Sequence, residues 1–445
     1  MYGMRTPAPS RPCCRVREAI DRYWQGEGKN LQTITRRLAM DTTFMQLKRV
    51  KLLLGLLGIL ATSIAFAQAP IRVGFPMILS GAGGQFGTPI LKGAQMYVDE
   101  INATGGVLGR KIELVPRDTK SRPDEAVRVA RELVLRENVD FLVGTFTSGE
   151  GPAVSVIAKE AKKVFIAVAP KTDRLTAPDA IHPYVFRAAA NTTTEGRAAA
   201  MIVAKWNIKR LATIAPDFAY GRDATASFVA HIKKLRPDIE IVDQQWPKLN
   251  ESDYTPFITA QLGKKPEAVF SVICCGNFDS FARQAGAQGY FKSISNNFIG
   301  LGEAGSIEAL RALGAEYPLG VYANTYDAFY WKPKDTEVAR LHAAFTKRLS
   351  TAFKDDTPPS WAVQGYISMQ FLVEGIKKAN SIDSDKVSTA LKGLEILSPQ
   401  GKITMRAKDQ QATRGMLWGK ATNRDGYPFP ILDPVELIDP TLFMD

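Results

Sequence analysis

The chain has 445 residues, of which 45% are hydrophobic and 23% are charged, and its formal net charge is +12 at pH 7. Residues 1–67 hold 11 of the 57 Lys and Arg but only 4 of the 45 Asp and Glu, so the net charge of the remaining residues is only +5. This weak basic excess argues against nucleic acid as a partner, and 378 residues are enough for two lobes with separate cores.

The first element along the chain is an uninterrupted apolar run over 52–66. Three of the four residues 48–51 are basic, and the tripeptide AFA at 65–67 is a small-x-small pattern. These features are typical of a Sec-type signal peptide, so we expect export to the periplasm and a mature chain that starts near Gln68. A membrane anchor is disfavoured because a spanning helix needs about 20 apolar residues.

The lead before this run, residues 1–44, is unusually long and basic for a signal peptide. We therefore expect that translation begins at Met40 or Met45. A twin-arginine signal at 36–37 is disfavoured because the apolar run starts too far downstream.

From residue 70, short β-branched runs alternate with amphipathic stretches. The glycines at 105–106 are expected just beyond a helix C-terminus. Strands separated by helices of this length pair in parallel through right-handed crossovers. In chain order we expect strand 71–75, helix 88–102, strand 111–116, helix 123–137, strand 139–144, helix 151–162 and strand 164–169.

The alternation restarts after residue 187, which predicts a second lobe with the same architecture. The expected fold class is therefore α/β, with two doubly wound parallel-sheet lobes joined by short hinge segments. The second set comprises strand 210–215, helix 222–235, strand 239–246, helix 254–263, strand 268–273, helix 277–288 and strand 296–302. Further helices are expected at 335–352, 360–379 and 384–393, followed by strand-like segments at 402–405 and 415–421.

Polar loops follow the predicted strands of the first lobe, at the sheet edge where open α/β folds place ligands. The loop 80–87 fails as a G-x-G-x-x-G dinucleotide motif because Phe86 takes the third glycine position. Ser148 precedes a predicted helix, where it serves either as a helix cap or as part of an anion site. Thr172 offers another hydroxyl, and the neighbouring Lys171 could add charge to the site, although a solvated lysine is expected.

The matching edge of the second lobe carries Tyr220, Asn277 and Glu303. A carboxylate and a phenol at strand ends suit an ammonium group, although Glu303 could simply stabilise a helix N-terminus and Tyr220 could be a packed loop residue. Cys274 and Cys275 are adjacent, and adjacent cysteines rarely form a relaxed disulfide, so we expect two buried small apolar side chains.

Catalytic constellations are scarce in the sequence. The three histidines are isolated from one another and from any Cys or acid pair, and H-E-x-x-H, G-x-S-x-G and clustered metal ligands do not occur. We therefore expect no enzyme, no catalytic residues, no metal and no cofactor.

Four segments in order resemble one known family. They are IRVGFPMILSGAGGQFG with LKGAQMYVDEINATGGVLGRKIELVPRD, then VDFLVGTFTSGEGPAVS, then DFAYGRD, and then FARQAGAQG. Over 70–435 the chain is similar to the leucine/isoleucine/valine-type periplasmic solute-binding proteins that feed ABC transporters. The resemblance implies the type I periplasmic-binding fold, with three inter-lobe crossings near 188, 324 and 416.

The resemblance also implies domain limits and ligand contacts. The first lobe would comprise 70–188 and 324–416, and the second 189–323 and 417–445. Ser148 and Thr172 would hold a ligand carboxylate, while Tyr220 and Glu303 would meet its ammonium group. The implied side-chain pocket is lined by Phe86 and Trp361, with Asn277 near a further contact.

The sequence departs from the family pattern in two places, at the position of a disulfide found in close relatives and in the ligand pocket. Ser121 and Thr147 stand where close relatives of the leucine binders have a disulfide. Phe86 replaces a more usual tyrosine, which makes that wall more apolar.

The implied function is capture of a small amino acid, branched-chain or otherwise apolar, and its delivery to an ABC permease in the inner membrane by a monomeric protein. Aromatic carboxylates of the benzoate or coumarate type are the alternative ligands, because they suit the same scaffold and an aromatic wall. A ligand-sensing module is a further alternative.

Overall fold

The computed structural model describes residues 68–444. The predicted signal peptide and both predicted translation starts lie outside these residues. Within 68–444, no helix has the length and apolar character needed to cross a membrane.

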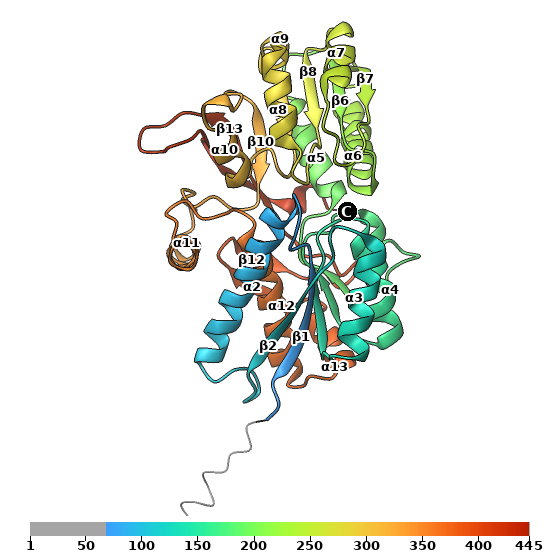
Figure 1. Cartoon of the computed structure of the whole chain (residues 1–445), viewed down its shortest axis with the longest axis vertical. Helices are drawn as coiled ribbons and strands as arrows, with labels where there is room; N and C mark the ends of the chain where they lie inside the picture. Colours follow the sequence, from blue (N-terminus) through green and yellow to red (C-terminus); the bar gives the residue numbers. More distant parts are fainter. Residues whose placement is uncertain (1–67, 445) are drawn as a thin grey trace, which may run out of the picture. The chain divides into compact units, whose positions relative to one another are not determined.

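The first lobe is built on a five-stranded parallel sheet with the order β2-β1-β3-β4-β5. Figure 1 shows helices on both faces of this sheet. Its elements in chain order are β1 (Ile71–Met77), α2 (Gly84–Ala103), β2 (Ile112–Asp118), α3 (Pro123–Leu135), β3 (Phe141–Gly144), α4 (Glu150–Ala161), β4 (Phe165–Ala167), η1 (Asp173–Thr176) and β5 (Val185–Arg187).

The second lobe contains an eight-stranded sheet with the order β14-β13-β10-β9-β8-β6-β7, to which β15 adds beside β13. Its elements are α5 (Thr192–Val203), β6 (Arg210–Ile214), α6 (Ala219–Leu235), β7 (Glu240–Gln245), α7 (Thr255–Gly263), β8 (Ala268–Ser271), α8 (Phe278–Ala287), α9 (Tyr290–Ser293), β9 (Phe298–Gly300), α10 (Ile307–Leu313), η2 (Gly314–Glu316), β10 (Tyr322–Thr325), β13 (Met416–Thr422), β14 (Ile431–Leu432), β15 (Glu436–Ile438) and η3 (Pro440–Leu442).

From β10 to β7 this second sheet is parallel, as the sequence pattern predicted, but antiparallel strands are added at one edge. β13 runs antiparallel to β10, and β14 and β15 are antiparallel to β13. β10 leads out of this lobe and β13 leads back into it after a long excursion, while only loops join β13, β14 and β15, so antiparallel pairing is the direct result.

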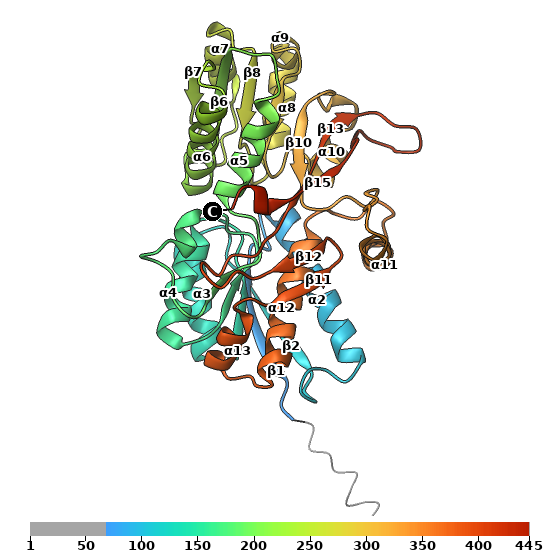
Figure 2. The same cartoon turned by 180° about the vertical axis from the view of Figure 1, so that it is seen from behind.

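Between β10 and β13 the chain adds α11 (Thr336–Phe353), α12 (Ala362–Ala379), α13 (Ser384–Leu391) and the hairpin β11 (Glu395–Ser398) and β12 (Gly401–Thr404). Of these, α12, α13, β11 and β12 lie in the same lobe as the first sheet, whereas α11 lies to one side (Figure 2). Buried side chains of α11 and α12 join the same apolar cluster as β1 and α2. The chain therefore crosses between the lobes three times, and the exact domain limits stay a prediction.

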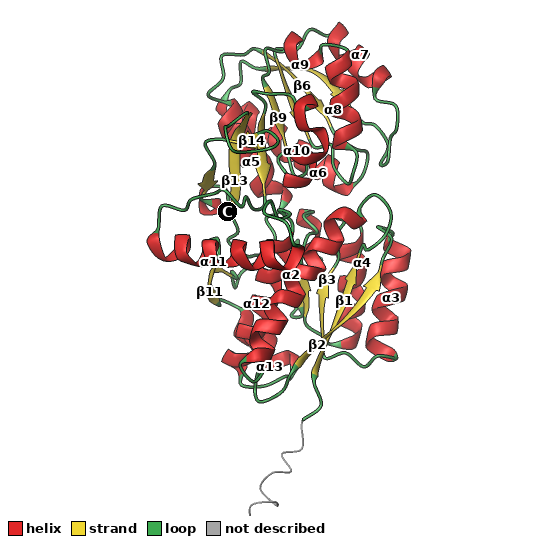
Figure 3. Ribbon diagram, turned by 60° about the vertical axis from the view of Figure 1, so that its left-hand side comes forward, coloured by secondary structure: helices red, strands yellow, loops and turns green. Residues whose placement is uncertain are grey.

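The central strands of both sheets are buried on both faces because helices cover both (Figure 3). In β3, Phe141 and Val143 join one apolar cluster and Leu142 joins the other. In β6, the neighbouring residues Leu211 and Ala212 likewise belong to two different apolar clusters, one on each face of the sheet. A two-sided apolar environment explains why these strands appear in the sequence as continuous hydrophobic runs.

Helices α2 and α12 pack closely because each carries a glycine at the contact. A Cβ atom on Gly93 would lie 1.9 Å from the Ala362 carbonyl oxygen, and one on Gly365 would lie 1.9 Å from that of Ile90. The start of α2 has the same constraint, since a Cβ on Gly87 would lie 1.7 Å from the Ile78 oxygen. This close packing places the first turn of α2, with Phe86, against the core.

Candidate ligand-binding site

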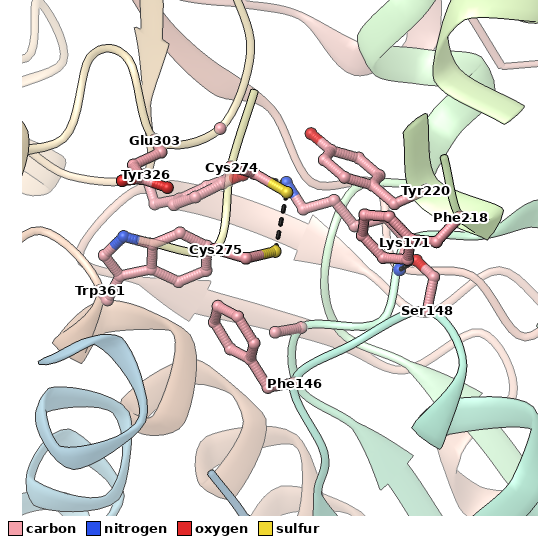
Figure 4. Close-up of a pocket in the computed structure, with 12 residues that line it drawn as sticks. Phe146, Ser148, Lys171, Phe218, Tyr220, Cys274, Cys275, Glu303, Tyr326 and Trp361 are labelled. Atoms are coloured by element: carbon pink, nitrogen blue, oxygen red, sulfur yellow. Dashed lines mark hydrogen bonds between the residues drawn. The ribbon is translucent and has the colours of Figure 1, made fainter. Parts of the chain in front are cut away.

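The loops at the carboxyl ends of strands from both sheets enclose a cavity of about 30 Å³. Figure 4 shows the side chains that line it, drawn from both lobes. Such a volume holds about two or three water molecules, since one water needs about 10–15 Å³ of this kind of space. The lining residues are Phe146, Ser148, Ala169, Lys171, Phe218, Tyr220, Cys274, Cys275, Gly302, Glu303, Tyr326 and Trp361.

Ser148 lies in the loop between β3 and α4, and its side chain is 4% exposed. Its Oγ accepts hydrogen bonds from the backbone N–H groups of Lys171 and Thr172, at 3.3 and 3.2 Å. Ser148 does not cap α4, because Glu150 accepts from the N–H groups of Phe146 and Thr147. Its hydroxyl proton is therefore free to be donated to an anionic ligand group at the start of α4.

Lys171 contradicts the expectation of a solvated lysine. It lies in the loop after β4, and its side chain is 5% exposed because it enters the cavity and forms an ion pair with the fully buried Glu195 of α5. Its Nζ also donates to the Tyr326 hydroxyl and lies 3.9 Å from the centre of that ring. Burial lowers the pKa of Lys171, and the neighbouring Glu195 carboxylate opposes this shift.

The Glu195 carboxylate also binds a phenol of the second lobe. Tyr220 donates its hydroxyl to Glu195 Oε2 at 2.8 Å, and Tyr326 lies 3.4 Å from the other oxygen. Burial raises the pKa values of both tyrosines well above the usual range, so both phenols are neutral donors.

Glu303 follows β9, is 2% exposed and lines the opposite side of the cavity. Its carboxylate accepts from the backbone N–H of Gly276 at 2.8 Å and from that of Phe278 at 3.4 Å. Burial raises the pKa of Glu303 to about 8, although these two N–H groups favour the ionised form. Among the described residues, no cationic side chain forms an ion pair with it.

One wall of the cavity is aromatic. The Trp361 ring lies 4.3 Å from that of Tyr326 and 5.2 Å from that of Phe146, measured between centroids. Phe86 packs behind this wall, 5.3 Å from Trp361 and stacked on Phe146 at 6.0 Å. Such edge-to-face and stacked contacts fix the orientation of the rings that face the cavity.

Of the seven site residues that the sequence predicted, four line the cavity: Ser148, Tyr220, Glu303 and Trp361. Phe86 supports the aromatic wall from the first turn of α2. Thr172 is fully buried and donates its hydroxyl to Asp223 of α6 at 2.5 Å. Asn277 precedes α8, and its side chain donates to the Cys274 carbonyl at 3.0 Å.

Sequence reasoning missed the buried ion pair and the exposure of the cysteines to the cavity. Glu195 lies in a threonine-rich helix start that no predicted element covered, so nothing in the sequence paired it with Lys171. Cys274 is buried as expected, whereas Cys275 is partly exposed, and both line the cavity. Their position in the loop that follows β8 was the available signal, because strand ends converge on the site.

Comparison with known proteins places this arrangement in a family. The sequence profile described as periplasmic binding protein matches residues 70–426. The Leu/Ile/Val-binding protein BraC3 of Rhizobium johnstonii is 28% identical over 78% of this chain and 90% of its own length. The leucine-, isoleucine-, valine-, threonine- and alanine-binding protein of Pseudomonas aeruginosa is 25% identical over 77% of this chain and 87% of its own.

A solved structure shares the fold as well. The solute-binding protein of an ABC transporter from Rhodopseudomonas palustris BisB5, in complex with 3,4-dihydroxybenzoic acid, superposes with a TM-score of 0.72 and is 25% identical. The match covers 84% of this chain and 99% of that one.

Two α/β lobes with a cavity between their strand ends define a type I periplasmic binding protein. The chain belongs to the periplasmic binding protein family and is a solute-binding protein of an ABC transporter. The comparisons also confirm that it is a binding protein and not an enzyme. Its family is periplasmic, as the sequence analysis expected.

Proposed function

We propose that this protein captures a small apolar amino acid, branched-chain or similar, between its two lobes and delivers it to an ABC permease in the inner membrane. The signal peptide at 52–66 would direct its export, and the mature protein would act as a monomer.

The observation that carries this proposal is the buried Glu303 carboxyl group that faces the cavity. Burying an ionised carboxylate without a cation is costly, which is why the pKa of Glu303 is raised to about 8. A ligand ammonium group placed beside Glu303 would supply the missing positive charge. The Lys171 ammonium does not do so, because it is paired with Glu195.

The other end of the ligand would meet the first lobe. The Ser148 hydroxyl lies at the start of α4, where the positive end of the helix dipole favours a carboxylate. The aromatic wall of Phe146, Tyr326 and Trp361 would then pack against an apolar side chain. Carboxylate, ammonium and apolar side chain together describe an amino acid.

Ligand entry requires that the cavity enlarge, because about 30 Å³ is too small for an amino acid. We propose that the lobes rotate about the crossings near 188, 324 and 416. The contacts that open and close would include the Lys171–Glu195 pair and the Thr172–Asp223 hydrogen bond, which join loops of the first sheet to helices α5 and α6. Ligand would favour closure because it contacts both lobes only then.

A thermal-shift screen tests the proposal. At 100 times its dissociation constant, a ligand stabilises the folded protein by about 2.7 kcal/mol. We expect a raised melting temperature with at least one of leucine, isoleucine, valine, alanine and phenylalanine. If none of the five shifts the melting temperature of the correctly folded protein, the amino-acid proposal fails.

Aromatic carboxylates are the second candidate class. The aromatic wall favours them, and a structural neighbour binds 3,4-dihydroxybenzoic acid. The substitution Glu303→Ala separates the two classes, because an aromatic acid has no ammonium group. Loss of binding on this substitution supports an amino-acid ligand, whereas unchanged binding of 4-hydroxybenzoate supports an aromatic acid.

A further inference from the structure

The cavity wall contains the two cysteines of residues 68–444, Cys274 and Cys275, and both are free thiols. Their Sγ atoms lie 2.7 Å apart, compared with about 2.05 Å in a disulfide bond (Figure 4). The side chains of adjacent residues usually diverge, so this approach calls for an explanation.

The backbone of the loop between β8 and α8 provides that explanation. Cys275 has a φ of 69° and Gly276 a φ of 94°, both in the left-handed region. A non-glycine residue seldom adopts this conformation, and it turns the chain so that both thiols point to the same side. The carbonyl of Cys274 is held by Asn277 and the N–H of Gly276 by Glu303, at 3.0 and 2.8 Å, so the turn is fixed at both ends.

The compartment favours oxidation of such a pair. Thiols of periplasmic proteins meet an oxidising environment, and the partly exposed Cys275 is accessible to a thiol oxidant. Adjacent Cα atoms are only about 3.8 Å apart, closer than in ordinary disulfides, and bonds that depart from relaxed geometry are more easily reduced. Regulatory and catalytic disulfides belong to this strained or exposed class.

We propose that Cys274 and Cys275 form a reversible vicinal disulfide that makes one wall of the ligand cavity. The thiolate of Cys275 attacks a disulfide oxidant and releases one thiol. The Cys274 sulfur, as it loses its proton, then displaces the second thiol from the mixed disulfide. One S–S bond forms in the protein and one breaks in the oxidant, which takes up two electrons and both protons.

Oxidation would change the cavity chemically as well as in shape. Two S–H groups that can donate weak hydrogen bonds become a sulfur pair that cannot. The ring also constrains the backbone beside Gly276, whose N–H binds Glu303. The redox state of the pair therefore acts on the carboxyl group that faces the ligand.

Peptide mapping tests the proposal on the exported protein, purified without reductant and exposed to glutathione disulfide. After denaturation and alkylation, the tryptic peptide that ends at Arg283 should carry no alkyl group and should be lighter than the dithiol form by two hydrogen atoms. If the folded protein is first treated with dithiothreitol, both cysteines should be alkylated.

The matched variants Cys274→Ser and Cys275→Ser control for incomplete alkylation. Each leaves one thiol, which has no vicinal partner, so after reduction the remaining cysteine should be fully alkylated. The proposal is overturned if both wild-type thiols are alkylated after exposure to the oxidant. It is also overturned if only a mixed glutathione adduct forms, or if reduction of the bond requires unfolding of the protein.

Discussion

Lys171 of the first lobe and Glu195 of the second form an ion pair inside the ligand cavity, with 5% and 0% of their side chains exposed. The pair lies among the phenols of Tyr220 and Tyr326, which bind the same carboxylate. Because the two charges compensate each other, Glu303 is left as the acidic cavity group that lacks a cationic partner within the described part of the chain. This division of charge underlies the proposed preference for a zwitterion.

The first prediction concerns the cost of breaking that pair. Removing one partner of a buried ion pair leaves an uncompensated charge and typically costs about 3–5 kcal/mol. We expect Lys171→Met to lower the free energy of unfolding, measured by urea titration, by about this amount. The additional substitution Glu195→Gln should restore much of the lost stability. Lys402→Met is the matched control, because the Lys402–Glu395 pair is 73% and 54% exposed and exposed pairs contribute at most about 1 kcal/mol. Equal effects of the two single substitutions would contradict a buried pair.

The second prediction concerns the pH dependence that Glu303 confers on the ligand-free protein. Its pKa is about 8 when folded and 4.5 in the reference state, so between these values the folded protein binds more protons than the unfolded chain. The free energy of unfolding therefore falls as the pH rises from 4.5 to 8, by about 1.4 kcal/mol per pH unit at most, and levels off above 8.

Urea titrations across this pH range, with Glu303→Gln as the reference, isolate the effect from other groups. We expect the stability of wild type relative to the variant to decline steadily with pH. If the difference in unfolding free energy between wild type and Glu303→Gln stays constant or grows with pH, Glu303 is ionised in the folded protein over the whole range from pH 4.5 to 8.

The third prediction tests the contact between α2 and α12. Gly365→Ala places a methyl group 1.9 Å from the Ile90 carbonyl oxygen, where backbone and not a flexible side chain must move. We expect destabilisation of about 1–3 kcal/mol, typical of overpacking. Gly286→Ala in α8 meets no atom within 4 Å and should stabilise the protein by up to about 1 kcal/mol. Similar unfolding midpoints for the two variants would argue against the close helix crossing.

The sequence was sufficient to predict most of the fold, because strands buried on both faces and amphipathic helices leave strong patterns. It missed α5, which begins with three threonines of poor helix propensity and depends on the Asn191 side chain, whose Oδ1 accepts from the Thr194 N–H at 2.9 Å. It also missed β10, whose four residues are too short a run to distinguish from a loop.

The candidate site was predictable where it depends on strand ends and less so where it depends on packing. Ser148 and Glu303 lie in the loops that follow β3 and β9, and both line the cavity. Phe86 was expected in a loop, but α2 begins at Gly84 and the residue is buried in its first turn. The start of α2 is set by close packing of Gly87 on the Ile78 carbonyl, a contact between neighbouring segments that no periodicity reveals.

Isothermal titration calorimetry of wild-type protein with L-leucine at pH 7, in two buffers of different ionisation enthalpy, tests the central claim most directly. If a ligand ammonium group pairs with Glu303, the carboxyl group with a pKa of about 8 must lose its proton on binding. The account predicts one bound leucine and the release of close to one proton, about 0.9, per ligand. Heat with 4-hydroxybenzoate but with none of leucine, isoleucine, valine, alanine and phenylalanine, or leucine binding without proton release, would contradict it.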